Sequence, residues 1–114
     1  KWWVVLGIPD GRPISNHQTV NIKTVRKKTF PLFGKVVDVI WKGNDRGTDL
    51  VNVLSTDPAI KTLSQRIGNL EIKNHSNEFQ GWTLTVDRRF SPINQDWETL
   101  EKVADHILSS PRRL

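Results

Sequence analysis

Three histidines are the side chains best suited to acid–base or metal chemistry near neutral pH, because an imidazole exchanges a proton or binds a metal ion there. They are His17, His75 and His106, and these positions show neither metal-ligand spacing nor a partnered nucleophile. The motifs G-x-S-x-G, H-E-x-x-H, G-x-G-x-x-G and G-x-x-x-x-G-K-[ST] do not occur in the chain. The sequence therefore predicts no catalytic residue, and an enzyme would need distant side chains to converge on one pocket.

A polar stretch, "WKGNDRGTD", offers a second kind of chemistry. Asn44, Asp45 and Asp49 carry oxygen atoms of the kind that a hard cation binds. Gly43 and Gly47 would let the backbone approach an anion at the start of a following helix. The spacing matches neither a calcium-binding loop nor a Walker phosphate loop. We interpret the stretch as a polar turn, and the sequence predicts no metal site and no cofactor.

Basic residues are the third group of candidates. The net charge is +5, and residues 1–57 hold nine Lys and Arg against five Asp and Glu. The densest run is "KTVRKK", Lys23 to Lys28. Because cations neutralise phosphates and indoles stack on unpaired bases, this run suggests nucleic-acid binding. The cations that would take part are Lys23, Arg26, Lys27, Lys28, Arg88 and Arg89.

An anionic membrane surface is the other polyanion that the same run would attract. Phe30, Leu32 and Phe33 follow the cations and would dip into the interface, unless they simply plug the core. No helix-turn-helix, zinc-finger, K-homology or ribonucleoprotein motif is present. Binding of nucleic acid or of an anionic membrane surface is therefore the alternative hypothesis for this chain.

Two adjacent tryptophans raise a different possibility in the opening segment, "KWWVVLGIP". In a strand, Trp2, Val4 and Leu6 would line one face while Trp3 and Val5 line the other. One of the two indoles then lacks a cover, unless the stretch "TFPLFG" folds over it. An indole left uncovered beside cations would form a contact surface for a partner.

The leading hypothesis is therefore a non-catalytic binding or accessory domain with an apolar, basic contact surface. The expected partner is another protein or a second copy of the chain, and no small-molecule substrate is evident. The surface is predicted to lie on the first strand and on residues 23–33. Its predicted contact residues are Trp2, Trp3, Lys23, Arg26, Lys27, Lys28, Phe30 and Phe33.

Hydrophobic periodicity predicts the elements that position these side chains. The expected strands are the opening segment, 18–27, 35–42, and a hairpin of 69–75 with 81–87. The expected helices are 50–54, for which a strand is the rival interpretation, 57–67 and a segment within 91–110. The last helix carries one apolar stripe, made of Trp97, Leu100, Val103, Ala104, Ile107 and Leu108.

These elements predict an α+β fold. We expect a single layer of mostly antiparallel sheet, about five strands wide, with two to three amphipathic helices on one face. Glu71, Lys73, Thr83 and Thr85 alternate with apolar residues, which indicates that the other face meets water. With 114 residues the chain can build one core, so residues 1–114 are expected to form a single domain.

The residue types that are absent restrict the protein further. The chain has no cysteine, which excludes disulfides, thiolate metal sites and a cysteine nucleophile. It has no methionine and begins with lysine, so we expect a piece of a longer or processed protein. No apolar run reaches the roughly 18 residues that a membrane-spanning helix needs. The sequence predicts a soluble domain and does not fix its compartment; the cytoplasm and a place next to a removed membrane or targeting segment are two candidates.

Overall fold

Eight elements make up the part of the chain that the computed structural model describes, residues 3–12, 19–28, 36–76 and 80–110. They follow one another in the order that the sequence predicts, three strands, two helices, two strands and a helix. The elements are β1 (Trp3–Pro9), β2 (Asn21–Lys28), β3 (Val36–Asn44), α1 (Leu50–Ser55), α2 (Pro58–Ile67), β4 (Leu70–Ser76), β5 (Gln80–Val86) and α3 (Asn94–Ser109). The segment around residue 52 is therefore a helix, and the rival strand is not formed.

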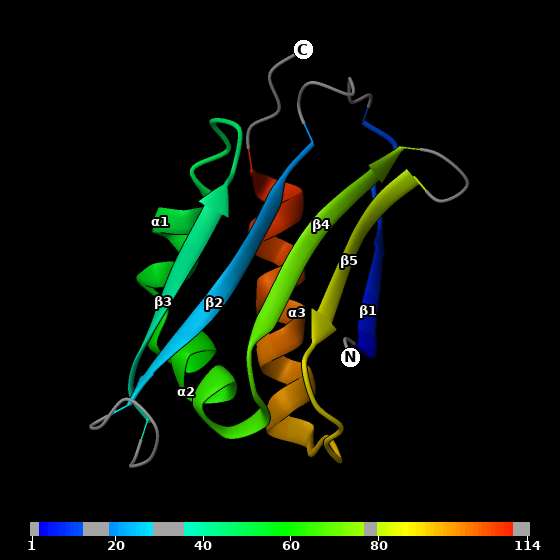
Figure 1. Cartoon of the computed structure of the whole chain (residues 1–114). Helices are drawn as coiled ribbons and strands as arrows, with labels where there is room; N and C mark the ends of the chain where they lie inside the picture. Colours follow the sequence, from blue (N-terminus) through cyan, green and yellow to red (C-terminus); the bar gives the residue numbers. More distant parts are fainter. Residues whose placement is uncertain (1–2, 13–18, 29–35, 77–79, 111–114) are drawn as a thin grey trace.

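The strands form one antiparallel sheet in the order β1-β5-β4-β2-β3. Strands β1 and β3 are therefore its edges. All three helices lie behind the sheet in Figure 1, so a single face is covered. The prediction of an α+β fold with helices on one face is confirmed.

Helix α2 begins and ends where its sequence predicts. The Asp57 carboxylate accepts a hydrogen bond from the Ala59 N–H (3.0 Å), and Pro58 occupies the first turn, where its missing N–H costs nothing. Gly68 ends the helix with a φ of 120°, a backbone conformation that favours glycine. Its apolar side chains face the sheet, and Ile60, Leu63 and Ile67 are buried.

Helix α3 departs from its predicted apolar stripe. Leu100, Val103 and Ile107 are buried as expected. In contrast, Trp97 is 42% exposed and Leu108 is 44% exposed. The assignment of these two residues to the core is therefore wrong. The buried side of the helix is centred on Leu100, Val103 and Ile107, and Trp97 and Leu108 lie at its flank.

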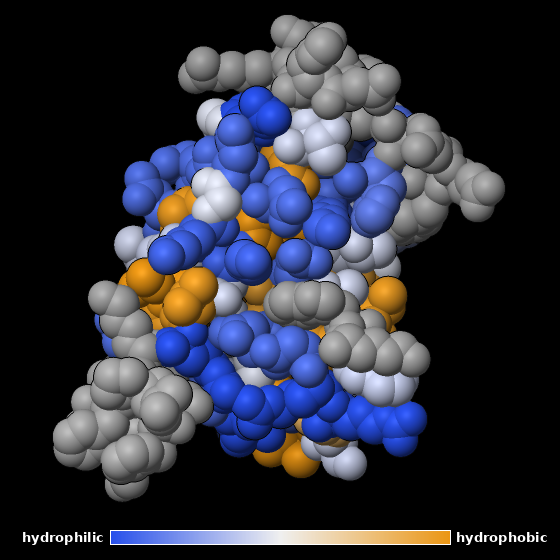
Figure 2. Space-filling view, in the orientation of Figure 1, coloured by the Kyte–Doolittle hydropathy of each residue, from blue (hydrophilic) through white to orange (hydrophobic). Residues whose placement is uncertain are grey.

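The open face of the sheet is polar. Leu70 and Ile72 are buried under the helices, whereas Glu71 and Lys73 alternate with them on the other side. Figure 2 looks onto this open face and shows mostly hydrophilic residues across it. The prediction of one buried and one wetted face is confirmed for the β4–β5 hairpin.

Strand β1 does not alternate regularly, because its register shifts between Val4 and Leu6. Val4 is 70% exposed, whereas Leu6 lies opposite the buried Leu84. The prediction that Val4 and Leu6 share a face is therefore wrong, since a bulge adds one residue and turns the rest of the strand over. As a result, Trp3, Val5 and Leu6 all pack against the core.

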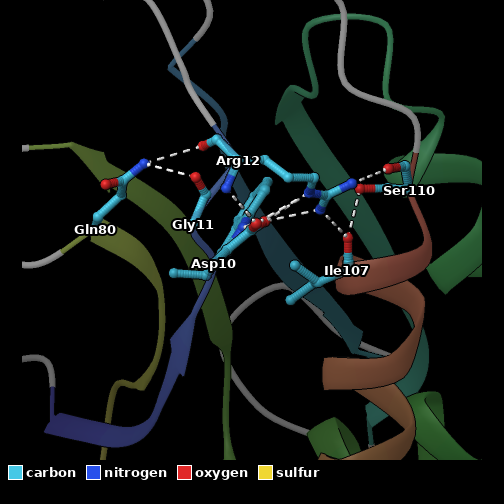
Figure 3. Close-up of polar contacts among 7 residues, drawn as sticks. Asp10, Gly11, Arg12, Gln80, Ile107 and Ser110 are labelled. Carbon is cyan, nitrogen blue, oxygen red and sulfur yellow. Dashed lines mark hydrogen bonds and ion pairs between the residues drawn. The ribbon is translucent and has the colours of Figure 1, made fainter.

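A buried ion pair ties the end of β1 to the end of α3 (Figure 3). Arg12 forks onto both oxygens of Asp10, with contacts of 2.7 to 3.1 Å. The same guanidinium donates to the carbonyl oxygens of Ser110 (2.7 Å) and Ile107 (3.3 Å) at the C-terminus of α3. Trp82 Nε1 donates to Asp10 from β5 (2.9 Å). We call Asp10 and Arg12 the Asp10–Arg12 clamp, and it joins β1, β5 and α3 at one end of the domain.

The clamp makes the stability of the fold depend on pH. Hydrogen bonds from Arg12 hold the pKa of Asp10 well below its usual 3.8; burial opposes this shift, and the Trp82 hydrogen bond adds to it. A folded-state pKa below the unfolded value stabilises the fold above pH 3.8, and this contribution is lost as the pH falls further. The loss has a limiting slope of about 1.4 kcal/mol per pH unit.

Urea unfolding of the wild type and of Asp10→Asn between pH 7 and pH 2 measures this contribution. We expect the wild type to be the more stable protein at pH 7 and the difference to shrink below about pH 4. The variant removes one titrating group and leaves all other carboxylates in place. A difference in the free energy of unfolding that stays constant down to pH 2 would contradict the assignment.

Candidate binding groove

A groove with a volume of about 510 Å³ opens at the edge of the sheet beside β1. Its walls come from the start of β1, the end of β5, the loop that follows β5 and the first turn of α3. The lining residues are Trp3, Val4, Val5, Val86, Arg89, Phe90, Ser91, Pro92 and Trp97. We call this the edge groove. Its volume falls within the roughly 300 to 1,000 Å³ typical of sites that enclose a ligand or a partner's side chains.

The loop that crosses the groove is held at both ends. Asp87 accepts hydrogen bonds from the backbone (3.0 Å) and side-chain (3.2 Å) nitrogens of Asn69, which directs the chain as it leaves β5. At the other end, the Ile93 N–H donates to the buried Asp96 carboxylate (2.9 Å) at the start of α3. Arg66 of α2 forms an ion pair with the same carboxylate. The loop and the first turn of α3 are therefore fixed relative to the sheet.

Arg89 is the one charged residue among the described residues that line the groove. Its guanidinium lies over the Trp3 ring, 4.6 Å from the ring centroid, which is a cation–π contact. Arg89 makes no hydrogen bond and no ion pair with any residue in the described part of the chain. The indole thus holds a planar cation in place while its N–H donors remain available for an acceptor.

The remaining walls expose apolar side chains next to one another. Val4 is 70% exposed and Trp97 is 42% exposed, and Phe90 lies half-buried in the lining. Ile93, at the same end of α3, is 54% exposed. Single exposed apolar residues are ordinary, but a contiguous group that lines a groove is typical of a contact surface.

Similarity to known proteins gives no guide to the role of the groove. The chain matches no protein-family model, no curated protein and no solved structure. None of the helices in the described part of the chain has the length and hydropathy that crossing a membrane requires. The role of the groove is therefore inferred from its own residues.

The structure separates the basic residues that the sequence grouped together. Lys23 is exposed on the open face, opposite Lys42 in β3. Arg26 is half-buried and lies opposite Val39, a buried residue on the helix side. Burial lowers the pKa of Arg26, and the charge of Arg88 lowers it further. The two described cations of the "KTVRKK" run thus belong to different faces.

The remaining predicted contact residues have different outcomes. Trp3 lines the edge groove, and its role as a contact residue stays a prediction. The side chains of Lys27 and Lys28 and the whole of Trp2 lie outside the described residues. Phe30 and Phe33 lie outside them as well, together with the proposed cover over the first strand. The first strand is thus the described part of the predicted surface that lines a groove.

Three groove residues were given other roles by the sequence. Arg89 was grouped with the phosphate-binding cations, Trp97 was assigned to the core, and Phe90 was given no role. A signal that favours a surface role for Trp97 is its place in the first turn of α3, at the flank of the helix side that buries Leu100 and Val103. The groove itself joins three segments that are far apart in the chain, and no local pattern reports such a meeting.

The polar turn uses its oxygen atoms to support the backbone. Asp45 accepts hydrogen bonds from the N–H groups of Gly47 (3.2 Å) and Val51 (3.2 Å). Asn44 accepts one from the Arg46 N–H (2.9 Å). Within the described part of the chain, no group of three or more His, Cys, Asp or Glu side chains could hold a metal ion. These contacts support the interpretation as a polar turn that precedes α1.

The two described histidines lie away from the edge groove. His75 Nε2 lies 2.8 Å from the Thr83 hydroxyl on the open face of the sheet. His106 Nε2 lies 3.4 Å from Asp57, the capping residue of α2. Burial raises the pKa of Asp57, but the hydrogen bond from Ala59 and the contact with His106 outweigh it, and the pKa is lowered. His106 therefore links α3 to the start of α2.

Proposed function

We propose that this chain is a non-catalytic binding domain whose edge groove contacts a protein partner. The observation that carries the proposal is Arg89, a cation held over Trp3 whose N–H donors have no partner among the described residues. The other described residues that line the groove are apolar, apart from Ser91. This arrangement favours a partner segment that combines apolar side chains with a carboxylate.

The apolar walls would supply the binding energy. Burying one Leu, Ile or Phe side chain contributes about 1.5 to 3 kcal/mol. Trp97 and Arg89 are of the residue types that dominate contact energies in protein interfaces. A carboxylate paired in fork geometry with Arg89 would add orientation to that energy.

The lining of the groove supports binding rather than catalysis. A guanidinium donates hydrogen bonds and accepts none, so Arg89 does not provide a general base. Ser91 carries a hydroxyl group, and no described lining residue is a base that would activate it. A groove whose described lining combines apolar side chains with one guanidinium is suited to recognition.

Polyanion binding through the basic run Lys23 to Lys28 is the alternative proposal. On the open face, the described part of the chain places Lys23, Lys42 and Lys73, but no indole or phenyl ring on which a base would stack. A steep loss of affinity for single-stranded nucleic acid between low and physiological salt would favour this alternative. So would its abolition by the double change Lys27→Glu with Lys28→Glu.

Selection from a phage-displayed library of random peptides tests the proposed function. We expect enriched peptides to combine apolar residues with Asp or Glu, because the groove offers apolar walls and one cation. Their affinity should fall at least about tenfold, or 1.4 kcal/mol, in each of the variants Arg89→Glu and Trp97→Ala. Both side chains are exposed, so thermal unfolding of these variants should stay close to that of the wild type.

Lys42→Glu is the matched control, because it reverses one charge on the open face of the sheet, away from the groove. Its affinity for the same peptides should remain within about twofold of the wild type. Peptides that bind both groove variants as tightly as the wild type, or a selection without enrichment, would overturn the proposal.

A further inference from the structure

The outer edge of β1 is exceptional for an edge strand. β1 borders the sheet and pairs with β5, and no described strand lies beyond it. Its sequence, WVVLGIP, contains no charged residue over seven positions. Proteins usually protect such edges with lysine or other charges, because an unprotected edge pairs with further strands.

The opposite edge of the same sheet shows the usual protection. Strand β3 carries two charged residues, Asp38 and Lys42, and Lys42 lies on the open face opposite Lys23. Asp38 also forms an ion pair with Lys61 (3.2 Å). In β1, the bulge after Val4 and the proline at position 9 shorten the stretch that could pair with a further strand. Neither feature places a charge on this edge.

The uncharged edge and the edge groove are continuous. Trp3, Val4 and Val5 belong to both, since they open the strand and line the groove. A strand laid along β1 would turn every second side chain toward the helix side, where the groove lies. Its backbone would meet the edge while its side chains meet Phe90 and Trp97.

We propose that an extended, apolar and acidic segment of a partner protein adds to the outer edge of β1 as a further strand. This inference rests on the proposed function and specifies how the partner is held. Backbone hydrogen bonds to β1 supply affinity, and alternate side chains in the groove supply specificity. A carboxylate of the segment pairs with Arg89 at the groove.

Charge complementarity favours such a partner over a second copy of the chain. The chain has a net charge of +5, so two copies repel each other. Pairing β1 with β1 would join two uncharged strands, and the partner strand would bring no carboxylate to Arg89. The net positive charge of the domain would attract an acidic segment. A carboxylate of that segment would accept hydrogen bonds from the Arg89 N–H groups, which have no partner in the described part of the chain.

Synthetic peptides as long as β1, with both ends blocked, test the inference. The probe alternates valine and glutamate, and a matched control alternates valine and lysine. We expect the lysine peptide to bind at least about tenfold more weakly, because it places cations near Arg89. In the complex, the β1 amides that do not pair with β5 should exchange hydrogen at least about tenfold more slowly than in the free protein.

Two N-methylated forms of the probe separate strand addition from docking of side chains alone. Each form blocks the N–H groups on one side of the peptide strand and keeps every side chain. We expect one form to lose at least about tenfold in affinity and the other to bind like the probe, since one side of a strand faces β1. Equal affinity of the two forms would overturn strand addition.

The outcomes also distinguish this inference from the proposed function. If the library peptides bind in an Arg89-dependent way and the valine–glutamate probe does not bind, strand addition is wrong and the groove remains a contact surface. If sedimentation shows that the free protein is a dimer which the probe dissociates, the natural occupant is a second copy and the choice of an acidic partner is wrong.

Discussion

Replacing Arg12 with alanine is expected to lower the free energy of unfolding by about 3 kcal/mol, because the change leaves a buried carboxylate without its cation. The Asp10 side chain is only 4% exposed, whereas Arg12 is 34% exposed, which places the effect at the lower end for buried pairs. The variant also removes the donors to the last carbonyl oxygens of α3. Urea unfolding at pH 7 measures the effect.

Two controls separate the parts of this prediction. Arg12→Lys keeps the positive charge but loses the fork, so its stability should fall between those of the wild type and Arg12→Ala. Arg46→Ala removes an exposed arginine whose one described side-chain hydrogen bond is long (3.4 Å), and we expect a loss of less than about 1 kcal/mol. If Arg12→Ala cost no more than Arg46→Ala, the clamp would not contribute to stability.

Gly43→Ala is expected to destabilise the fold by about 3 kcal/mol, because the added methyl group meets backbone that cannot move aside. A Cβ atom at this position would lie 2.3 Å from the Asn21 carbonyl oxygen and 2.9 Å from the Ile22 Cα atom. The φ of Gly43 is 120°, where side-chain-bearing residues are strained. Because Gly43 pairs with Ile22, the β2–β3 pairing would have to open.

Gly11→Ala provides the matched control for this substitution. A Cβ atom on Gly11 would meet nothing within 4 Å, so the free energy of unfolding should change by less than about 0.5 kcal/mol. Both variants are compared by urea unfolding under the same conditions. Equal stabilities of the two variants would show that the close approach of β2 to β3 at Gly43 is not needed for the fold.

Much of the fold follows from local patterns in the sequence. Alternation of Leu70 and Ile72 with polar neighbours predicts a strand with one buried face. The apolar stripe of Ile60, Leu63 and Ile67 predicts a helix between Asp57 and Gly68. Both predictions are confirmed. Such patterns succeed because the sheet and the helices each bury a single face in one core.

The parts that could not be predicted depend on contacts between distant segments. The bulge in β1 is set by its pairing with β5, so the sequence of β1 alone suggests regular alternation. Trp97 has the spacing of a core residue, but it lies at the flank of the buried side of α3 and is 42% exposed. The edge groove is lined both by residues at the β1 bulge and by Trp97, so it depends on both features.

The candidate site was predicted in part. Trp3 was correctly placed in the first strand, and the groove beside it is consistent with the expected apolar and basic surface. The basic component, however, is Arg89 from the loop after β5, rather than a residue of the β2 run in the described part of the chain. The charge of the "KTVRKK" run favours β2 as the basic part of the surface. The groove instead opens beside β1, because β1 is at the edge of the sheet.

Nuclear magnetic resonance of the ¹⁵N-labelled protein, titrated with the blocked valine–glutamate peptide, tests the central claim most directly. The indole N–H signals of Trp3 and Trp97 should shift on binding, while those of the buried Trp41 and Trp82 remain in place. The backbone amide signals of β1 should shift together with them. Shifts confined to the open face around Lys23 and Lys42, or the absence of any shift, would contradict a binding site at the edge groove.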